Sequence, residues 1–507
     1  MMKIFSSDKV REIDAYTIEN EPIRSTDLME RAATALFKWY IQHFDRSCGV
    51  AVFTGPGNNG GDGLALSRML AGAGYNVKVY YVAISSKTSK DWSINKDRLL
   101  QQNKAEYSEI KEIGDFPFIK PADIIIDSIF GSGLTRPVEG LPAQVIMKIN
   151  EAEARVVSVD IPSGLFGEDN TNNDMDSIIR AEYTLTLQFP KVSFFFAENQ
   201  HFVGKFHVLP IGLHAAKISS MPTDYNIIDS SLVAGILQNR NKFDHKGNFG
   251  HGLMVAGSCG KAGAAVLASH AALRTGIGLL TAHVPRPVGD IIHTALPEAM
   301  VQCDQSDLMV TEIPDPGKYD ALGVGPGLGT KPNTRKGLRD LLEKYNGPLV
   351  IDADALNIIA SEKDLSGLIS EDNILTPHPG EFRRLTGSDD NAFSRLVKQQ
   401  EYSRKHKCVI VLKGAHSSVT LPDGRVWFNS TGNPGMATAG TGDVLTGMIL
   451  GLLAQGYKPS EAAIGAVYIH GLAGDIAAES KGFESLIASD IIFNIGNSFK
   501  KIRQYKN

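Results

Sequence analysis

The sequence predicts an α/β protein with two large domains, each built around a parallel sheet. Three observations lead to this prediction. Short apolar runs of β-forming residues alternate with helical stretches along the chain, which is the pattern of parallel sheets covered by helices. Several runs end at a glycine turn or at an aspartate, where the loops of such a sheet gather. The chain of 507 residues is also too long for one ordinary core.

In the first half, a strand, a glycine-rich turn and a helix follow one another near residue 50. The turn, Thr54-Gly-Pro-Gly-Asn-Asn-Gly-Gly-Asp-Gly63, precedes a largely apolar stretch typical of a helix. Two later strands stop at Asp127 and Asp160. Aspartates just past strand ends, with a glycine loop after an early strand, indicate a Rossmann-like three-layer domain with a site at the top of its sheet. The expected strands are 50–53, 77–83, 123–127 and 155–160, and the expected helix is 63–73.

The pattern weakens after Leu209, where residues 210–229 mix Gly, Ser, Pro and polar side chains. We therefore place the domain boundary at about Leu213–Thr223. Before this boundary, we interpret Lys191 and the run Phe194–Phe196 as a β-rich segment of the core.

The second half repeats the alternation with different residues. A second glycine-rich segment, Thr431-Gly-Asn-Pro-Gly-Met-Ala-Thr-Ala-Gly-Thr-Gly-Asp443, opens a long apolar helix. Strands alternating with helices again indicate an α/β domain with its loops at one edge of the sheet. The expected strands are 252–256, 319–323, 348–352, 373–376 and 408–412, and the expected helices are 264–274 and 444–453.

Both glycine-rich segments end in an aspartate, Asp62 in the first and Asp443 in the second. Chain this poor in side chains can bring backbone N–H groups close to a ligand, which suits phosphate or another anion. A carboxylate is unsuited to holding an anion, but it can remove a proton or contact a cation beside it. Two such segments suggest two reactions on one kind of phosphate-bearing molecule.

Composition narrows the classes of protein. The hydrophobic content of 43% and the charged content of 21% are those of a soluble globular protein, and no apolar stretch is long enough for a membrane span. The formal net charge of −5 offers no basic surface to nucleic acid or to an anionic membrane. The four cysteines lack metal-ligand spacing, and the N-terminus lacks the apolar stretch of a signal peptide. We therefore expect a cytoplasmic protein.

Motifs in the second half resemble one family of the ribokinase-like superfamily. The cradle from Asn433 to Asp443 follows a strand and opens a long helix, as the anion hole of that superfamily does. Together with Val324–Gly329, Asp352–Asn357 and Thr376–Phe382, it is similar to the ADP/ATP-dependent NAD(P)H-hydrate dehydratases. The resemblance covers residues 225–507, which implies a ribokinase-like α/β fold for the second domain.

The first half resembles the NAD(P)H-hydrate epimerase domain over residues 1–215. Its motifs are Asn58-Asn-Gly-Gly-Asp62, Asp127-Ser-Ile-Phe-Gly-Ser-Gly133 and Asp160-Ile-Pro-Ser-Gly164. Two domains in this order make the whole chain similar to the bifunctional NAD(P)H-hydrate repair enzymes.

The resemblance implies two reactions on a reduced nicotinamide cofactor, NADH or NADPH, that has added water across the C5–C6 double bond. The second domain would phosphorylate the C6 hydroxyl from ADP or ATP, with magnesium, and then lose phosphate to restore the double bond. The first domain would interconvert the two epimers, because the second domain uses only one of them. The family also implies a symmetric homo-oligomer.

The resemblance further implies roles for individual residues. Asp443 would be the base that takes the hydroxyl proton, while Asp127 and Asp160 are the candidate catalytic carboxylates of the first domain. Asn59, Asp127 and Ser163 resemble the potassium ligands of the family. The implied contacts to the hydrate are Asn58, Asn59, Gly60, Gly61, Asp62, Gly131, Ser132, Gly133, Leu134, Thr135, Arg136, Pro137, Asp160, Ala264, Gly325, His378 and Asp443. The implied contacts to the nucleotide are Lys413, Gly414, Ala415, His416, Ser417 and Gly442.

Several of these residues have structural alternatives. His378 lies between two prolines and could brace a turn, and Asp127 and Asp160 could cap turns. Lys413 could be an ordinary exposed lysine. Glu381 could face phosphate through Mg²⁺ or could begin a helix as a first-turn acid.

Two rival functions remain at this point. A sugar or vitamin kinase, with an accessory N-terminal binding domain, would use the same cradle and base but would release a stable phosphoester. A non-enzymatic binding module is disfavoured by the intact Asn58–Asp62 motif and by Asp127 and Asp160. The sequence leaves open the choice between ADP and ATP, the choice between the NADH and NADPH hydrates, and the role of Lys261.

Overall fold

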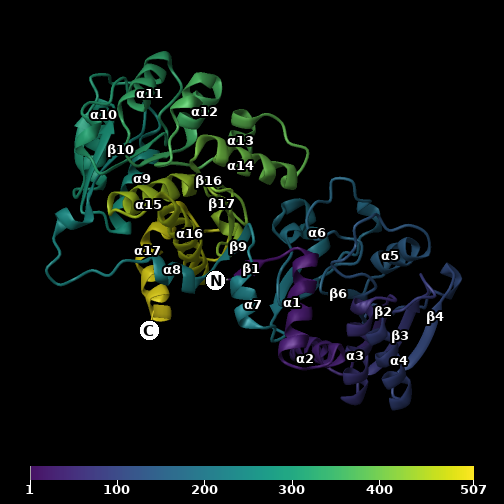
Figure 1. The fold of residues 1–507 in the computed structure, drawn as a ribbon. Coiled ribbons are helices and arrows are strands. Elements are labelled where there is room, and N and C mark those ends of the chain that lie inside the picture. The colour runs from purple at the N-terminus through teal and green to yellow at the C-terminus, as the bar shows by residue number, and fades with distance from the viewer. Residues whose placement is uncertain (1, 507) are drawn as a thin grey trace. The chain divides into compact units, whose positions relative to one another are not determined.

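The computed structural model describes residues 2–506, which form two compact units (Figure 1). The first unit comprises residues 3–223 and the short stretch Asn391–Phe393, and the second comprises most of the chain from Asp224 onward. The segment where the sequence pattern weakens contains a short helix, α7 (Ala215–Ser220). Strand β1 (Met2–Ile4) lies at the start of the described chain. Within residues 2–506, no helix is both long enough and apolar enough to cross a bilayer.

The first unit is built on a seven-stranded parallel sheet. Its strand order, β4-β3-β2-β5-β6-β7-β8, reverses direction between β2 and β5. The loops that follow these two strands therefore diverge, which is where a doubly wound sheet binds its ligand. The strands are β2 (Gly49–Thr54), β3 (Asn76–Val82), β4 (Glu106–Ile110), β5 (Ile124–Ser128), β6 (Arg155–Val159), β7 (Tyr183–Leu187) and β8 (Lys205–Leu209).

Helices cover both faces of this sheet, so the predicted three-layer arrangement is confirmed (Figure 1). Val50 and Val52 of β2 belong to the core under α2 and α3, whereas Ala51 and Phe53 belong to the core under α5. The alternation follows from the two-residue period of a strand that is buried on both faces. The helices are α1 (Ser7–Asn20), α2 (Ser25–His43), α3 (Asn58–Gly72), α4 (Lys90–Gln102), α5 (Leu141–Glu151) and α6 (Gln200–Val203), with 3₁₀ turns η1 (Ile113–Asp115), η2 (Met175–Ser177), η3 (Val192–Phe195) and η4 (Ala197–Asn199).

Two local expectations for this unit are wrong. The helix expected from residue 63 begins at Asn58, so the end of the glycine-rich segment is the first turn of α3 rather than a loop. The segment after Lys191, interpreted as β-rich, is instead the 3₁₀ helix η3. Its phenylalanines are buried as expected, but burial alone does not distinguish a strand from a tight helical turn.

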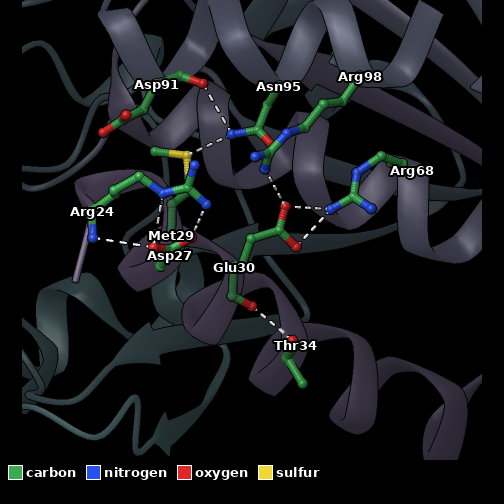
Figure 2. A network of polar contacts seen from close by, with 9 residues as sticks. All are labelled: Arg24, Asp27, Met29, Glu30, Thr34, Arg68, Asp91, Asn95 and Arg98. Carbon is green, nitrogen blue, oxygen red and sulfur yellow. Dashed lines mark hydrogen bonds and ion pairs between the residues drawn. The ribbon is translucent and has the colours of Figure 1, made fainter. Parts of the chain in front are cut away.

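A polar network fixes α3 against its neighbours (Figure 2). Glu30 on α2 accepts hydrogen bonds from Arg68 on α3 and from Arg98 on α4, with a distance of 2.9 Å between Arg98 Nη1 and Glu30 Oε1. All three side chains are half-buried, so these ion pairs are less screened than pairs on the open surface. The network therefore holds the helix whose first turn lies at the switch point.

The second unit contains a mixed sheet in the order β9-β18-β17-β16-β15-β14-β13-β10-β11-β12. Neighbouring strands are parallel except around β17, which is antiparallel to β16 and to β18. The strands are β9 (Tyr225–Ile228), β10 (His251–Val255), β11 (Leu279–Val284), β12 (Met300–Cys303), β13 (Ala321–Val324), β14 (Leu349–Ile351), β15 (Asn373–Leu375), β16 (Val409–Leu412), β17 (Ser418–Thr420) and β18 (Val426–Asn429).

Helices also cover both faces of the second sheet (Figure 1). The two predicted helices 264–274 and 444–453 are confirmed as α9 and α15. They pack so closely that a Cβ on Gly447 would collide with the Ala268 carbonyl oxygen. The helices are α8 (Ser230–Ile236), α9 (Ala262–Thr275), α10 (Arg286–Ala295), α11 (Pro332–Lys344), α12 (Ala353–Ser361), α13 (Pro379–Thr386), α14 (Ala392–His406), α15 (Thr441–Ala454), α16 (Pro459–Lys481) and α17 (Ala488–Arg503). The 3₁₀ turns are η5 (Lys246–Phe249), η6 (Pro316–Lys318), η7 (Lys363–Leu368), η8 (Pro434–Met436) and η9 (Gln504–Lys506).

Candidate active sites

The first unit has a cavity of about 480 Å³ at its switch point. Its walls come from the loops after β2 and β5, from α1 and from the segments after β6 and β7. A second hollow of about 370 Å³ shares Ser132, Gly133, Leu134 and Lys191 with the first and reaches Thr135. The polar residues that line the first cavity include Asp14, Asn58, Asn59, Asp62, Asp160 and Lys191, and the glycine loop after β5 contributes Gly131, Ser132, Gly133 and Leu134.

The glycines at the start of α3 let the helix approach the sheet. A Cβ on Gly60 would collide with the carbonyl oxygen of Gly55, and a Cβ on Gly63 would collide with Ser128 Oγ. Asn58, Asn59 and Asp62 line the cavity, whereas Gly60 does not. Gly61 faces Met29 on α2, because a Cβ on it would lie 2.8 Å from Met29 Cε. Arg136 and Pro137, also predicted to contact a ligand, are not among the residues lining this cavity or its neighbouring hollow.

Asp160 follows β6 in a strained conformation, with a φ of +65° that residues other than glycine rarely adopt. Its Oδ1 lies 2.7 Å from Lys191 Nζ, which also donates to Thr186 Oγ1 and to the Phe189 carbonyl oxygen. The Lys191 side chain is only 5% exposed. Both groups line the cavity, so it contains a buried ion pair at its wall.

Asp127 lies deeper than the cavity and is fully buried. Its carboxylate accepts hydrogen bonds from Ser158 Oγ at 2.8 Å and from the backbone and side chain of Ser163 at 2.8 and 2.5 Å. Asn59 and Ser163 meet at Phe130, because Asn59 Nδ2 donates to the Phe130 carbonyl oxygen and Phe130 N–H donates to Ser163 Oγ. The three residues predicted as potassium ligands are therefore linked through shared partners, while Asn59 Oδ1 is buried without a hydrogen-bond partner in the described chain.

In the second unit, Asp443 is the third residue of α15, and the left-handed Gly440 caps that helix. The Asp443 residue is half-buried. Burial and the neighbouring carboxylate of Asp352 raise the pKa of Asp443 to about 7, although the Lys413 ammonium acts in the opposite direction. The group can therefore gain and lose a proton near neutral pH.

Asp352 and Lys413 form an ion pair beside this helix start. Lys413 Nζ lies 2.7 Å from Asp352 Oδ1, and Thr446 Oγ1 on α15 donates to Asp352 Oδ2 at 2.7 Å. Burial acts to lower the pKa of Lys413, but Asp352 and Glu381 outweigh it and the pKa lies above its ordinary value. Lys413 is thus a half-buried cation in the carboxylate cluster, and not an ordinary exposed lysine.

The strand-end loops of β10, β13 and β14 lie close together around three glycines. Gly325 has a φ of +128°, and a Cβ on it would collide with the Asp352 carbonyl oxygen. A Cβ on Gly327 would lie 3.0 Å from Ala264 Cβ, which places Ala264 of α9 beside the same loop. Lys261 Nζ lies 3.1 Å from Asp354 Oδ2, and that oxygen also accepts from Gly329 N–H.

His378 and Glu381 begin helix α13. His378 Nδ1 accepts from Gly380 N–H at 3.0 Å, and Glu381 Oε2 accepts from His378 N–H at 2.9 Å. Glu381 therefore caps the first turn of α13. Its Oε2 also lies 3.9 Å from Lys413 Nζ. The His378 side chain is about half exposed at 51%, so its Nδ1 is engaged in the cap while the ring remains accessible.

The segment 413–417 forms the turn between β16 and β17. Gly414 N–H donates to Ser417 Oγ at 3.2 Å, and His416 Nδ1 lies 3.2 Å from the Asn429 carbonyl oxygen. Gly414 is exposed, and a Cβ on Gly442 would lie 3.4 Å from Lys413 Nζ. The structure thus places Lys413, its turn and the start of α15 next to one another.

The residues of the first cavity that sequence reasoning missed include Asp14 and Lys191. Asp14 belongs to α1, far from every glycine motif, and Lys191 was interpreted as part of the core. For Lys191, the signal was an isolated lysine before an apolar run that is otherwise fully buried. Within residues 2–506, no group of three or more His, Cys, Asp and Glu side chains is arranged to hold a metal ion.

Comparison with protein families divides the chain in the same way. Residues 253–496 match a family described as NAD(P)H-hydrate dehydratase, and residues 25–193 match one described as YjeF-related protein N-terminus. The bifunctional NAD(P)H-hydrate repair enzyme Nnr of Moorella thermoacetica is 35% identical, with 97% of this chain and 95% of that protein covered. The corresponding enzyme of Thermofilum pendens is 32% identical, with 99% and 97% covered.

Solved structures resemble the second half. An ADP/ATP-dependent NAD(P)H-hydrate dehydratase of Bacillus subtilis, co-crystallised with ATP and Mg²⁺, is 31% identical, with 55% of this chain and 98% of that chain covered and a TM-score of 0.46. A ribokinase-like protein of Enterococcus faecalis is 27% identical, with 56% and 98% covered and a TM-score of 0.49.

Proposed function

Because the chain belongs to the family of bifunctional NAD(P)H-hydrate repair enzymes, we propose that its two sites act in turn on hydrated NADH or NADPH. Residues 1–215 are the epimerase domain, which interconverts the R and S hydrates. Residues 225–507 are the dehydratase domain, which uses ADP or ATP to return the S hydrate to NAD(P)H. The enzyme works in the cytoplasm as a homo-oligomer.

The dehydratase proposal rests on the pKa of Asp443 and on its position at the start of α15. Its pKa of about 7 matches the requirement of a general base, which must be deprotonated at working pH and still basic enough to take a proton. It lies at the start of α15, whose dipole and free N–H groups favour an anion. In this proposal Asp443 takes the proton of the C6 hydroxyl while that oxygen attacks the terminal phosphoryl group, and the bridging P–O bond breaks to release AMP from ADP or ADP from ATP. Phosphate then leaves C6 and a proton leaves C5, which restores the C5–C6 double bond.

The backbone of the cradle would hold the transferred phosphoryl group. Ala439 is exposed and Gly440 turns the chain into α15, so we assign the contacts to the phosphoryl oxygens to the N–H groups from Ala439 to Gly442. Lys413, paired with Asp352, would bring a positive charge to the same place. Gly325, Ala264 and His378 would contact the hydrate from the neighbouring loops.

The nucleotide would bind to the turn Lys413–Ser417 and to Gly442. The exposed Gly414 leaves the backbone of this turn open, and the turn lies beside the start of α15. Magnesium would arrive with the nucleotide phosphates and so belongs to the substrate. Glu381 already caps α13, so its part in holding that ion would be secondary.

The cavity of the first unit would hold the hydrate for epimerisation. Asn58, Asn59, Asp62 and the loop from Gly131 onward would contact the cofactor, and Asp160 would approach the reactive ring. Potassium fits the linked set of Asn59, Asp127 and Ser163, because Asn59 Oδ1 is buried without a partner and the set offers oxygen atoms with one carboxylate. The ion would fix the loops after β2, β5 and β6 in place.

One experiment tests both halves of the proposal. The purified protein is mixed with hydrated NADH and ADP, and absorbance at the reduced-nicotinamide band is followed. We expect complete recovery from a mixture of R and S hydrates, and recovery of the S hydrate alone if the epimerase domain is inactive. A stable phosphoester that accumulates without recovery would instead assign a kinase.

A further inference from the structure

Asp14 has no role in the sites described so far, yet it faces the epimerase cavity. It lies on α1, a helix whose other acidic residues are exposed, and it lines the cavity together with Asp160 and Lys191. Its Oδ1 is buried and has no hydrogen-bond partner in the described chain. Burying an unpaired carboxyl oxygen destabilises a fold, so this orientation calls for a functional explanation.

Asp14 and Asp160, which line the same cavity, differ in their surroundings. Asp160 has a cationic partner, because its Oδ1 lies 2.7 Å from Lys191 Nζ. Asp14 is not paired with Lys191, and burial followed by the charge of Asp160 raises the pKa of Asp14 to about 6 against the effect of Lys191. Asp62 on α3 and Arg11 on α1 also line the cavity, and burial raises the pKa of Asp62 well above its ordinary value too. One cavity can supply both an acid and a base when its two carboxyl groups lie in such different environments.

Epimerisation of the hydrate requires both an acid and a base. The C6 carbon bears the hydroxyl and is bonded to the ring nitrogen. When the C6–O bond breaks, its electron pair leaves with the oxygen, which must gain a proton to depart as water. The nitrogen lone pair forms a C=N double bond to C6. Water then adds to the other face of that carbon, the C=N electrons return to nitrogen, and the added water loses one proton.

We propose that Asp14 is the second catalytic residue of the epimerase domain and donates the proton to the departing C6 hydroxyl. Asp160, held by Lys191, accepts the proton from the water that adds to the opposite face. In the reverse direction the two carboxyls exchange roles, so one site serves both epimers. This inference rests on the proposed epimerase function, and it adds to that function a residue from a helix outside the glycine motifs.

The test follows epimer exchange in Asp14→Asn. The R hydrate of NADH is incubated with potassium but without nucleotide, and the appearance of the S hydrate is measured by chromatography. We expect kcat to fall by about 10²–10⁴. Uptake of ¹⁸O from labelled water into the C6 hydroxyl should fall in parallel. Glu19→Gln, which changes an exposed acid on the same helix, should exchange epimers at the wild-type rate.

Two further measurements keep the test decisive. Thermal unfolding should show that Asp14→Asn folds, and Asp14→Glu should recover part of the lost rate because it restores a carboxyl group. Full exchange by Asp14→Asn, a change in KM alone, or wild-type exchange without ¹⁸O uptake would overturn the inference. A wild-type protein that does not exchange epimers at all would overturn the proposed epimerase function itself. If Asp14→Asn does not fold, a folded but inactive Asp14→Glu overturns the inference and an active one supports it.

Discussion

The two glycine-rich segments look alike in the sequence but do different things in the fold. In the first, Gly60 and Gly63 are needed because side chains there would collide with Gly55 and with Ser128, so these glycines bring protein against protein. In the second, Gly432 and Gly440 adopt left-handed conformations with φ of +107° and +89° on partly exposed backbone. Gly435 of this segment is packed against protein as well, since a Cβ on it would lie 2.7 Å from the Phe483 carbonyl oxygen. A glycine-rich run therefore predicts close approach of the backbone, but the fold decides whether the neighbour is a helix or a ligand.

The two aspartates that end these segments also differ. Asp62 is buried, only 8% exposed, with its carboxyl at the cavity wall among other acids. Asp443 is half-buried on the first turn of α15, where a cation at Lys413 and a carboxylate at Asp352 act on its pKa in opposite directions. Similar motifs thus give a carboxyl in a buried acidic cluster in one unit and a half-buried carboxyl beside a cation in the other.

The largest expected effect is a loss of activity at one site while the other site keeps its activity, and one substitution in each domain tests it. Asp443→Asn preserves the size of the side chain but removes the base, so ADP-dependent dehydration should fall by about 10²–10⁴ while epimer exchange continues. Asp160→Asn should do the reverse, and the R hydrate should accumulate. The measurement is chromatography of what remains after repair of a mixed-epimer sample. If Asp160→Asn abolishes repair of both epimers, the division of labour is wrong.

A second prediction compares the glycines themselves. Gly60→Ala should destabilise the epimerase domain by about 3 kcal/mol or more, because the new Cβ would meet backbone that cannot move away. Gly442→Ala should leave the stability of the dehydratase domain within about 1 kcal/mol, since its Cβ would meet only the end of Lys413 at 3.4 Å. Denaturant unfolding of each variant measures both values. Equal losses would show that the two segments are packed alike.

The third prediction concerns pH. The dehydratase needs Asp443 as a carboxylate, and a pKa of about 7 means that the active form increases as pH rises through neutrality. The rate of dehydration should therefore increase about tenfold from pH 6 to pH 8. The S hydrate with saturating ADP provides the assay, and Asp443→Asn should lose this pH dependence. A rate that falls over the same range would assign the group as an acid instead.

The smallest expected effect tests the ion in the epimerase domain. Replacing potassium with a large organic cation should slow epimer exchange by about tenfold, because the buried oxygens of Asn59, Asp127 and Ser163 would lose their ligand. Dehydration of the S hydrate in the same buffer is the control, because it depends on the dehydratase domain and should keep its rate. Epimer exchange at an unchanged rate would remove potassium from the proposal.

The sequence alone predicted the order of the main strands and helices and offered several candidate functional side chains. Asp127, Asp160 and Asp443 could be identified because each lies at the end of an apolar run or the start of a long helix, and such positions follow from local periodicity. The resemblance to the repair family rested on short motifs of the same kind. These motifs and patterns are local, so they can be recognised without knowledge of the fold.

Only the tertiary structure decided what surrounds those side chains. It brought Asp14 of α1 and Lys191 of the segment after β7 to the same cavity as Asp160, although Asp14 is separated from both by well over a hundred residues in the sequence. It also paired Lys413 with Asp352 and began α3 within the glycine-rich segment. Burial and charge pairing depend on which elements pack together, and that information is spread over the whole chain. Asp14 and Lys191 are therefore the residues that no local pattern could identify, because only the packing of α1 and of the segment after β7 brings them to Asp160.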